Sequence, residues 1–493
     1  MIPRTSPSTL DDSLPRARRA QSTWSRLSLR HRLSLVRSFR HLLVEHCDAL
    51  CAAVARDLDK PSHETLACEV LPLADACRFL ERRAACLLRP RRLSISSRPL
   101  WLWGQRDTVL RRPRGVVAII GTWNYPLYLN GTQIVQGLTA GNAIVWKPSE
   151  VAPASAAVLH DLLLRAGFPA DLCPMLEPTR RAGEALIEAD IDHLVFTGSA
   201  STGCAIACRL GERLIPSTLE LSGCDALFVL NDADVPLAAR AAWFGTTLNR
   251  GQTCLASRRI FVQRDVYSAF VEALRSEARR ASAVALALPA QTRLAERLVR
   301  EALAEGGRLL LETPAASDDR CVPQAVIDAR PDMALCREAS FAPIAAVLPF
   351  DSVEEALGME RQCPYALGAS IFTKDERRAR HLAESLRAGM VTINDVIVST
   401  AHPATPFGGS GASGWGSTQG VEGLLEMTVP QVVSARSGSF RPHYELALGQ
   451  DARRQEEMLR GLLQSAHAPT WFQRLRGWLR LVRGARRLQE RMG

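Results

Sequence analysis

The stretch GVVAIIGTWNYP, residues 115–126, decides the fold class of this 493-residue chain. It opens with a short run of β-branched residues, which is typical of a strand buried on both faces. It ends in a turn closed by proline, which a central strand does not contain. Similar runs follow at NAIVW (142–146), HLVFT (193–197) and ALFVL (226–230), with helical patterns between them. Strands that alternate with helices predict a mostly parallel sheet with crossover connections.

The regions on either side of this pattern predict further elements. Residues 15–90 have apolar side chains at helical spacing. The segment 95–113 is predicted to form a hairpin, with Leu100–Trp103 in one strand and Thr108–Leu110 in the other. The alternation of strands and helices resumes after Arg258, which indicates two α/β units that meet near residues 223–255.

Composition and cysteine usage exclude several protein classes. Hydrophobic residues make up 47% and charged residues 23% of the chain, which is ordinary for a globular protein. No apolar run reaches the length of about 18 residues that spans a bilayer, and the N-terminus lacks the apolar segment of an export signal. The 13 cysteines are odd in number, the chain is long and no export signal is visible, so a disulfide framework is not expected. No C-x-x-C pair or other recognisable zinc spacing occurs, so a metal site is not expected either. We expect a cytoplasmic protein.

The net charge of +10 does not indicate a nucleic-acid partner. Residues 471–493 hold seven arginines against one glutamate, so most of the excess lies in the last 23 residues. Only three of the 61 basic residues are lysines, namely Lys60, Lys147 and Lys374. None of them precedes Ser or Thr, which excludes a Walker A phosphate loop.

The C-terminal segment predicts a basic amphipathic helix. Arginines cluster on one side, and six large apolar residues share the other: Trp471, Phe472, Leu475, Trp478, Leu479 and Val482. Such a helix either packs on its own domain or lies on an anionic membrane surface. Both interpretations stay open.

Two segments are candidates for binding a dinucleotide, and one of them fails. Residues 409–414 spell G-x-G-x-x-G, but the proline-rich segment before them cannot be a central strand, so a glycine-rich turn at a domain contact is the better interpretation. Gly198 and Ser199 lie between a strand and a helical segment, where N–H groups and the positive helix end favour phosphate. A simple strand-to-helix turn is the alternative.

Lys147 and Glu150 follow the strand at 142–146. Lysine at the carboxyl edge of a sheet can bind a phosphate or a ribose hydroxyl, and a nearby glutamate can accept from ribose hydroxyls. The alternative is a solvated strand end. In a chain that almost always uses arginine, a lysine at this place hints at a chemical requirement.

Three residues are candidates for catalysis. Cys254 lies in the small, polar segment GQTC, where a thiol can be activated as a nucleophile, unlike a buried structural thiol. Glu220 lies between apolar neighbours, and burial raises a carboxyl pKa toward the range of a general base. Asn124 ends a strand at a turn, where its amide could bind an oxyanion or cap the turn.

The motifs in this order resemble the successive signatures of the NAD(P)-dependent aldehyde dehydrogenase superfamily. They are GVVAIIGTWNYP, AGNAIVWKPSE, FTGSASTG, LELSG, NRGQTCLA, F-x-P near 341 and PFGGSGASGWG. The resemblance covers roughly residues 15–435. The GTWNYP form and the compact helical N-terminus are similar to the fatty- or aromatic-aldehyde (class 3-like) branch.

The resemblance implies a role for each residue. Cys254 matches the nucleophile, Asn124 the oxyanion amide, and Glu220 the base that activates water to hydrolyse the thioester. Lys147 and Glu150 match contacts to the adenosine ribose, and Gly198 and Ser199 match the pyrophosphate turn. Trp123 and Phe341 would line the site near the nicotinamide and substrate. Glu150 repels a 2′-phosphate, which favours NAD, with NADP as the other cofactor of this branch.

The resemblance also implies an α/β architecture with a modified Rossmann cofactor domain, a catalytic α/β domain and a small β bridging element. We assign residues 1–94 and 114–223 to the NAD(P)-binding domain and 224–400 to the catalytic domain. Residues 95–113 and 401–436 form the bridging element, which builds dimers in this family, and 437–493 are a basic extension. A homodimer acting on a small aldehyde is therefore expected, with peripheral membrane contact through the extension as a hypothesis.

One segment departs from the family pattern. The family usually reads E-x-F-G-P where this chain has Ala339-Ser340-Phe341-Ala342-Pro343. The glutamate that holds the nicotinamide ribose is thus alanine, and Glu338 lies one position early, on the opposite face of an extended segment. Weaker nicotinamide positioning is expected. Three hypotheses remain: a hydrolytic dehydrogenase, a thioester-forming acyl reductase of the same fold, or a catalytically impaired paralogue.

Overall fold

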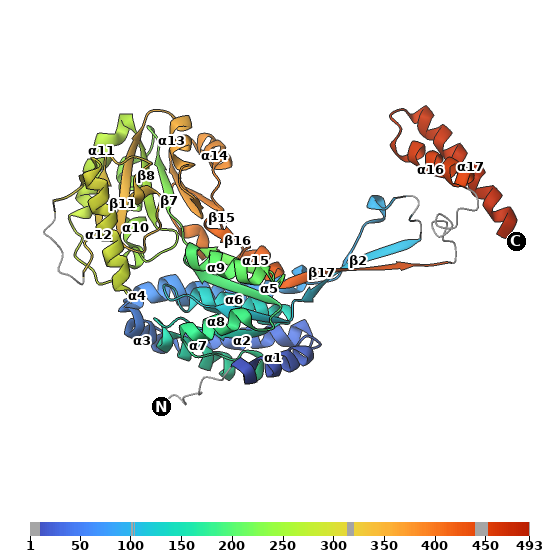
Figure 1. Ribbon diagram of the computed structural model, residues 1–493, viewed down its shortest axis with the longest axis horizontal. Coiled ribbons are helices and arrows are strands. Elements are labelled where there is room, and N and C mark those ends of the chain that lie inside the picture. The colour runs from blue at the N-terminus through green and yellow to red at the C-terminus, as the bar shows by residue number, and fades with distance from the viewer. Residues whose placement is uncertain (1–9, 100–101, 103, 313–319, 439–451, 493) are drawn as a thin grey trace. The chain divides into compact units, whose positions relative to one another are not determined.

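A computed structural model describes residues 10–99, 102, 104–312, 320–438 and 452–492 (Figure 1). The chain divides into two compact units. The first contains the residues up to Leu88 together with Arg112–Val429, and the second contains Arg89–Arg111 and the residues from Pro430 onward. All the residues predicted to form the active site lie in the first unit.

A five-stranded sheet contains the stretch that decides the fold class. Its strands lie in the order β16-β6-β5-β3-β4, and all are parallel except β16, which is antiparallel to β6. Every residue of β3 and β4 is buried, which explains their almost unbroken apolar sequences. The strands are β3 Val116–Ile120, β4 Ala143–Lys147, β5 His193–Gly198, β6 Ser217–Leu221 and β16 Gly414–Trp415.

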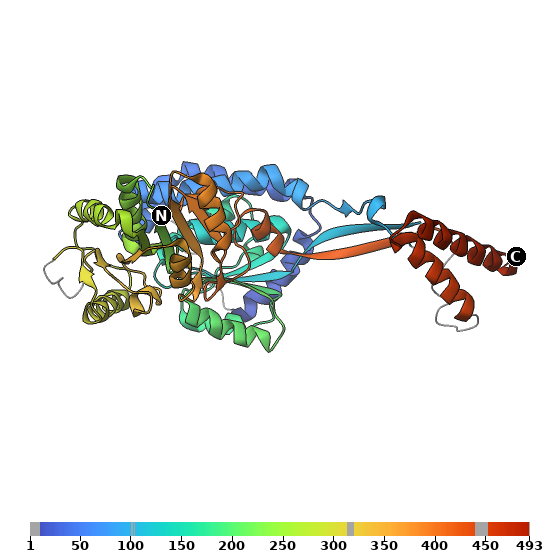
Figure 2. The same ribbon diagram turned by 90° about the horizontal axis from the view of Figure 1, so that it is seen from above.

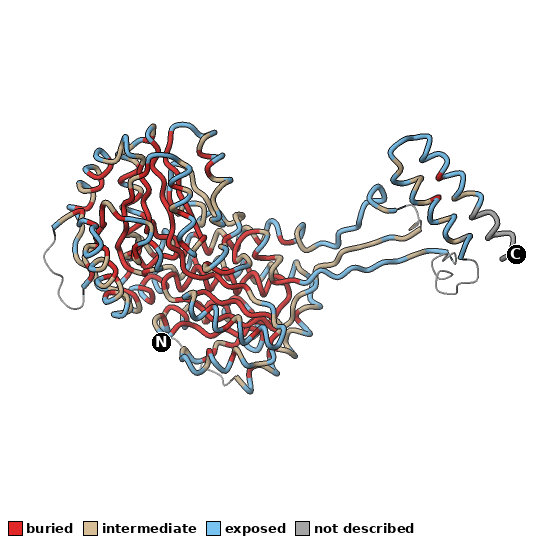
Figure 3. The backbone as a smooth tube through the Cα atoms, turned by 45° about the horizontal axis from the view of Figure 1, so that its top comes forward, coloured by how far each residue is buried: buried red, intermediate tan, exposed pale blue. Residues whose placement is uncertain are grey.

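Helices surround this sheet and share one apolar core with it, and buried residues run along the strands (Figure 3). The N-terminal region is helical, as predicted, with a π-helix at Leu66–Val70. Helix α6 is buried along its whole length because it packs against α2, α5 and α15. The helices are α1 Leu10–Trp24, α2 Leu29–Glu45, α3 Cys47–Leu58, α4 Ser62–Thr65, α5 Leu71–Leu87, α6 Tyr128–Ala140, α7 Pro153–Arg165, α8 Arg180–Glu188, α9 Ala200–Gly211 and α15 Gly420–Glu426.

A seven-stranded sheet forms the rest of the first unit, in the order β14-β13-β7-β8-β11-β10-β9. Only β9 is antiparallel to its neighbour. Successive side chains of β7 enter opposite cores: Phe228 packs with α12–α14, and Leu227 and Val229 pack with α10 and α11. The strands are β7 Asp225–Val229, β8 Ser257–Gln263, β9 Arg308–Leu309, β10 Gln324–Ile327, β11 Ile344–Phe350, β13 Gly368–Phe372 and β14 Met390–Ile393. The helices are α10 Val235–Thr247, α11 Arg264–Ala278, α12 Pro289–Ala304, α13 Val353–Glu360 and α14 Glu376–Ser385.

The chain crosses between the two sheets twice. It leaves β6 at Leu221 and enters β7 at Asp225, within the region where two α/β units were predicted to meet. It returns through the glycine-rich segment 409–414, where β15 (Ser410–Gly411) pairs with β12 (Tyr365–Ala366) and Gly414 pairs with β6. Ser413 lies between them, and its Oγ donates to the Ser222 carbonyl at 2.9 Å. This segment is a turn between sheets rather than a Rossmann loop.

The second unit contains a three-stranded sheet and two C-terminal helices. The sheet has the order β1-β2-β17, with β2 and β17 side by side (Figure 2). Its strands are β1 Arg91–Arg92, β2 Gln105–Pro113 and β17 Thr428–Arg436. The C-terminal helices, α16 Ala452–His467 and α17 Trp471–Met492, also pack side by side, with Gly461 and Gly477 buried where they meet.

The bridging element differs in detail from the sequence prediction. Strand β2 pairs with Arg91 and Arg92, so the first strand of the predicted hairpin begins earlier than residue 95. Leu100, Trp101 and Trp103 lie outside the described residues. Of the range 401–436, only β17 enters the three-stranded sheet, because β15 and β16 pair within the first unit. The remaining domain boundaries stay predictions.

Candidate active site

A cavity of about 1100 Å³ is lined by all nine predicted site residues. Four parallel strands end at this edge of the five-stranded sheet, which places Asn124, Lys147, Ser199 and Glu220 on neighbouring strand ends or loops. Cys254 enters from the loop before β8. The nine residues are Trp123, Asn124, Lys147, Glu150, Gly198, Ser199, Glu220, Cys254 and Phe341.

The loop after β3 fixes the side-chain amide of Asn124. Thr122 donates its hydroxyl hydrogen to Asn124 Oδ1 at 2.9 Å, and Asn124 Nδ2 donates to the backbone oxygen of Gln252 at 3.1 Å. Asn124 is buried. The amide N–H₂ therefore faces the loop that carries Cys254, which is the orientation that an oxyanion donor needs.

The loop that carries Cys254 has an unusual backbone. Asn249, Arg250 and Gly251 have successive φ angles of 52°, 59° and 73°, in the left-handed region. Such a backbone costs about 1–3 kcal/mol for each non-glycine residue and persists only where contacts hold it. Asn249 Nδ2 donates to the backbone oxygen of Asn124 at 2.9 Å, and buried Arg258 donates to the Gly251 carbonyl. The cysteine loop is thus held against the oxyanion loop.

Cys254 is buried, which corrects the expectation that its polar segment leaves the thiol exposed, and it interacts with Glu220 inside this site. Burial, and next the nearby Glu220 carboxyl, raise the pKa of the Cys254 thiol well above its usual value. Burial raises the pKa of Glu220 to about 7, although hydrogen bonds from Thr197 and Cys254 oppose that rise. Thr197 Oγ1 donates to Glu220 Oε2 at 3.1 Å, while buried Oε1 has no protein partner. Glu220 can thus exchange a proton at neutral pH with the thiol or with a water molecule.

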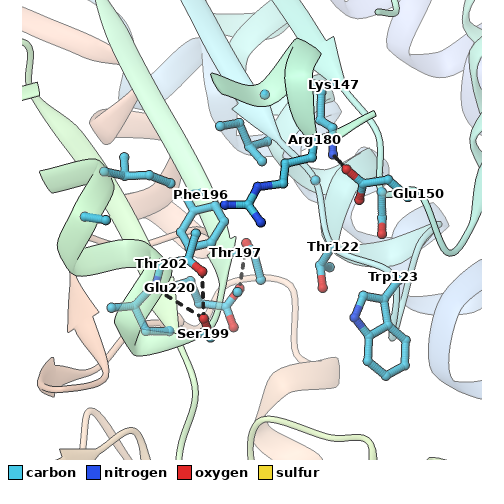
Figure 4. Close-up of a pocket in the computed structure, with 18 of the residues that line it drawn as sticks. Thr122, Trp123, Lys147, Glu150, Arg180, Phe196, Thr197, Ser199, Thr202 and Glu220 are labelled. Carbon is cyan, nitrogen blue, oxygen red and sulfur yellow. Dashed lines mark hydrogen bonds and ion pairs between the residues drawn. The ribbon is translucent and has the colours of Figure 1, made fainter. Parts of the chain in front are cut away.

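Lys147 and Glu150 form an ion pair at the other end of the cavity (Figure 4). Lys147 Nζ donates to Glu150 Oε1 at 2.5 Å, and the lysine is buried whereas the glutamate is exposed. Partial burial acts to raise the pKa of Glu150, but the hydrogen bond from Lys147, a backbone hydrogen bond and the charge of Lys147 together outweigh it and lower that pKa. The pair offers one cation and one acceptor to the hydroxyls of a ribose.

The turn between β5 and α9 forms the wall between these two ends. Gly198 ends β5, and Ser199 caps α9 by accepting from the Thr202 backbone N–H at 3.3 Å. Gly198, Ser199 and Thr202, at the N-terminal end of α9, all line the cavity (Figure 4), so the positive end of the helix lies at the cavity wall. A helix end with N–H groups suits a pyrophosphate.

Two aromatic rings flank the cysteine end of the cavity. The ring centroids of Trp123 and Phe341 lie 6.0 Å apart, at an interplanar angle of 55°. Phe341 is held by its backbone N–H, which donates to Gln291 Oε1 at 3.0 Å. Around Cys254 itself the packing is apolar, with Leu255, Leu367, Phe407, Met390 and Ile397 in the same cluster.

The donors and acceptors of the cavity fit a dinucleotide. The helix end at Ser199 suits the pyrophosphate and the Lys147–Glu150 pair suits a ribose, while the unpartnered oxygen of Glu220 lies at the reaction end. Among the described residues, no group of His, Cys, Asp and Glu side chains is arranged to hold a metal ion. The arrangement combines a thiol, an oxyanion donor, a buried base and a dinucleotide site.

Comparison with known families agrees with this geometry. The model of the aldehyde dehydrogenase family matches residues 1–433. The chain belongs to the aldehyde dehydrogenase family. It is therefore an NAD(P)-dependent oxidoreductase with the α/β fold that the sequence predicts.

Named relatives of this aldehyde dehydrogenase act on different aldehydes. The 4,4′-diapolycopene aldehyde oxidase of Methylomonas sp. is 31% identical over 438 residues, which cover 87% of this chain and 82% of the relative. The betaine aldehyde dehydrogenase of Cereibacter sphaeroides is 31% identical over 454 residues, 89% of this chain and 91% of the relative. A relative of 29% identity from Mycobacterium bovis carries NADP(+) in its name.

Solved structures show the same fold. The NAD+ complex of an aldehyde dehydrogenase from Bacillus cereus has a TM-score of 0.81 and 28% identity, and covers 87% of this chain and 89% of its own. PnpE from Pseudomonas sp. WBC-3 has a TM-score of 0.82 and 28% identity, with 88% and 91% covered. These likenesses support NAD or NADP as the cofactor.

The segment that departs from the family pattern leaves the cavity without a carboxylate at residue 339. Ala339 lines the cavity, as a residue at the family's glutamate position should. Glu338 instead pairs with Arg297 at 2.6 Å and is absent from the cavity lining. The expectation from the extended backbone, that Glu338 does not replace the missing glutamate, agrees with this placement.

Sequence reasoning missed two polar residues of the cavity. Thr197 pairs across the sheet with Glu220 and donates to its carboxyl. The position of Thr197 at the end of the strand HLVFT could have indicated this contact. Arg180, at the start of α8, extends toward Phe196 in the cavity and is held by Glu184 at 2.9 Å (Figure 4). Its sequence context gives no signal, because 58 arginines are spread through the chain.

Proposed function

We propose that this aldehyde dehydrogenase oxidises an aliphatic or aromatic aldehyde to the carboxylic acid, with Cys254 as nucleophile. The observation that carries the proposal is the meeting of Cys254, Asn124 and Glu220 in the cavity that also contains the dinucleotide-type residues. NAD is the favoured cofactor, since the carboxylate of Glu150 opposes a 2′-phosphate on the ribose.

The geometry supports a role for each of these residues, taken in the order of the reaction steps. Cys254 passes its proton to Glu220 and its sulfur attacks the aldehyde carbon to give a thiohemiacetal. The side-chain amide of Asn124, with the backbone N–H of Cys254, stabilises the oxyanion, and loss of one such donor typically costs about 10²–10³ in rate. Bound NAD(P)+ supplies the acceptor for the hydride that leaves this carbon.

Release of the product depends on Glu220. Once the thioester has formed, Glu220 loses to solvent the proton that it took from Cys254. The ionised carboxylate then accepts a proton from water, whose oxygen attacks the thioester carbon and frees the carboxylic acid, and Glu220 passes that proton to the departing Cys254 thiolate. The unpartnered Glu220 Oε1 provides a place for that water. The same base argues against a thioester-forming acyl reductase, because hydrolysis would destroy the thioester.

The surroundings of Cys254 favour an apolar substrate. Its neighbours are aliphatic or aromatic, and Trp123 and Phe341 flank the approach. The relative named 4,4′-diapolycopene aldehyde oxidase supports this choice, as does the similarity to the fatty- or aromatic-aldehyde branch. A charged substrate such as a semialdehyde acid would need a counter-charge among these neighbours.

One assay separates the three hypotheses. NADH or NADPH formation is followed with aliphatic and aromatic aldehydes, for wild type and Cys254→Ala, with and without coenzyme A. Turnover that the variant lacks supports the proposal. A coenzyme A thioester as product would favour the acyl reductase. Cofactor binding without turnover in the wild type would favour the impaired paralogue that Ala339 suggests.

For the second unit we propose contact with an anionic membrane. Trp471, Phe472 and Trp478 of α17 expose half or more of their surface within the unit, although they are large and apolar. Arginines interleave them, and residues 471–483 contain no acidic side chain. Among the described residues no helix is long and apolar enough to cross a bilayer. All 13 cysteines are free thiols, which fits a cytoplasmic location.

Sedimentation with vesicles tests the membrane proposal. The full chain should bind phosphatidylglycerol vesicles at low salt, and Trp471→Ser/Trp478→Ser should weaken binding with unchanged aldehyde oxidation. Equal sedimentation of both proteins, or none of either, would contradict it.

We further propose a homodimer formed through β17. This strand is the edge of its sheet and exposes Val432 and Val433. Light scattering on Val432→Lys should then report a monomer where the wild type is a dimer. A monomeric wild type would contradict the proposal.

A further inference from the structure

A buried ion pair lies directly behind the oxyanion loop. Lys60 Nζ and Glu69 Oε1 are 2.7 Å apart, and the two side chains are 1% and 0% exposed. Neither residue is among those that line the cavity. The pair therefore contacts no substrate, and any role in catalysis must come from the residues that it holds in position.

Lys60 and Glu69 both lie at irregular points of the helical N-terminal region. Asp59 ends α3 in the left-handed region with φ 52°, so Lys60 follows directly after the end of that helix. Glu69 lies in the π-helix Leu66–Val70, which interrupts the helical N-terminal region. A π-helix carries one extra residue in a turn, is rare, and occurs often at functional sites. Here it turns a carboxylate into the core.

The ion pair holds both sides of the Asn124 turn. Lys60 Nζ donates to the backbone oxygen of Asn124 at 2.8 Å, and Glu69 Oε2 accepts from the backbone N–H of Leu127 at 2.8 Å. Lys60 Nζ also lies 4.3 Å from the centre of the Tyr125 ring. The ammonium and the carboxylate thus fix a backbone segment whose side chain is the oxyanion amide.

The same contacts reach the cysteine loop. The hydroxyl of Tyr125 and Thr253 Oγ1 are 2.7 Å apart, one residue before Cys254. Asn249 donates to the same Asn124 carbonyl that Lys60 contacts. A displacement of Lys60 would therefore shift the amide and the thiol relative to each other, and catalysis is sensitive to shifts of about 1 Å.

Stability alone does not explain this ion pair. Desolvation of two buried charges is expensive, and an apolar pair of similar volume is often as stable or more stable. Lys60 is one of only three lysines among 61 basic residues, so arginine was the usual choice for a cation in this chain. A compact ammonium satisfies three partners at one point, whereas a planar guanidinium would leave donors unpaired.

We propose that Lys60, paired with Glu69, is a positioning residue that fixes the oxyanion amide of Asn124 against the Cys254 loop. The inference rests on the proposed function, since it assigns the pair to the same reaction. It extends that function to two residues outside the cavity. Lys60 acts only through the backbone of the Asn124 turn and transfers no proton.

A double-mutant cycle tests whether Lys60 acts through Asn124. Lys60→Met should lower the single-turnover rate of NADH formation by roughly 10- to 100-fold, less than the cost of about 10²–10³-fold for losing an oxyanion donor outright, because Asn124 is displaced but still present. In the Asn124→Ala background the same substitution should lower it less than twofold, because the amide it positions is gone. The Kd for NAD should stay unchanged in all four proteins.

Two further variants separate positioning from stability. Lys60→Met/Glu69→Leu removes both charges and should regain the unfolding temperature of the wild type while its rate stays low. Arg40→Met breaks an ion pair of similar length, 2.6 Å to Glu81, away from the turn. It should lower the unfolding temperature and leave the rate within twofold of wild type.

The outcomes are distinguishable from failure of the proposed function. A wild type that forms no NADH with any aldehyde contradicts that function and, with it, this inference. If the wild type is active, any of three results overturns the role of Lys60 and leaves the proposed function standing. The first is a Lys60→Met rate equal to that of the wild type, and the second is additive losses of rate in the Asn124→Ala background. The third is a double variant in which rate and stability are restored together.

Discussion

The pH dependence of turnover provides the sharpest test of the role of Glu220. Its carboxyl has a pKa of about 7, against an ordinary value of 4.5, chiefly because burial disfavours the charged form. Water activation needs the ionised carboxylate. Such a base is roughly nine-tenths ionised at pH 8 and roughly one-tenth ionised at pH 6. Where hydrolysis limits turnover, kcat should fall about tenfold between these pH values, whereas a carboxyl with an ordinary pKa would give almost no change.

Glu220→Gln should lower kcat by about 10²–10⁴ and abolish this step, because the amide cannot accept the proton of water. Thr197→Val is the matched control. It removes the hydroxyl that hydrogen-bonds Glu220 and lowers its pKa, so it should keep turnover and move the step to higher pH. Steady-state rates of NADH formation from pH 5.5 to 9 measure both variants. A flat wild-type profile, or a step that survives in Glu220→Gln, would refute the reasoning.

The raised pKa of Glu220 also makes the stability of the folded protein depend on pH. The folded state binds the Glu220 proton more tightly than the unfolded chain, so the free energy of unfolding falls as the pH rises from 4.5 to about 7. The rise in pKa corresponds to about 3 kcal/mol for this fully buried group. Glu220→Gln should therefore be more stable than the wild type at pH 8, by up to that amount, and no more stable at pH 4. Urea unfolding at the two pH values checks the difference.

Three further substitutions test other parts of the site. Ala339→Glu should restore a carboxylate to the cavity and raise turnover or cofactor affinity, measured as kcat and the KM for NAD; no gain in either would contradict the role given to residue 339. Glu150→Ala should raise the ratio of kcat/KM for NADP over NAD at least about tenfold, since removal of about 1.4 kcal/mol of charge repulsion suffices. An unchanged ratio would show that Glu150 does not face the ribose. Gly251→Ala should lower the free energy of unfolding by more than about 2 kcal/mol, because φ is 73° and an added Cβ would overlap the backbone of Ala342. A variant that unfolds at the same temperature as the wild type would contradict this.

Strands and their order along the chain follow directly from local sequence. Runs such as GVVAII are apolar at every position because both faces of the strand are buried, and the structure places that run between β5 and β4 in the five-stranded sheet. Parallel strands bring their carboxyl ends together, so residues that follow strands were good candidates for the site. This is why Lys147, Ser199 and Glu220, far apart in sequence, line the cavity as expected.

Contacts that depend on the packing of distant helices were not predictable in this way. Glu69 reads in sequence as an ordinary helical glutamate, and only the π-helix turns it inward. The position of Thr197 at a strand end marks it in sequence as a candidate, but its partner Glu220 follows only from the register between β5 and β6. The predicted bounds of the bridging element were wrong for a similar reason. Strand β16 is only two residues long, and it is defined by its pairing with β6 in the first unit rather than by its own sequence.

The two lysines near the site show how composition can replace some of this missing information. This chain uses arginine for 58 of its 61 basic residues, so a buried lysine marks a place where the guanidinium does not serve. Lys147 and Lys60 are both buried, and each donates to a carboxylate. The argument predicts a contrast within the chain: Lys147→Arg and Lys60→Arg should each impair the enzyme, the first through the KM for NAD and the second through the rate of the chemical step. Lys374 is exposed, and Lys374→Arg should change neither. Equal tolerance at all three positions would mean that the retained lysines carry no chemical information.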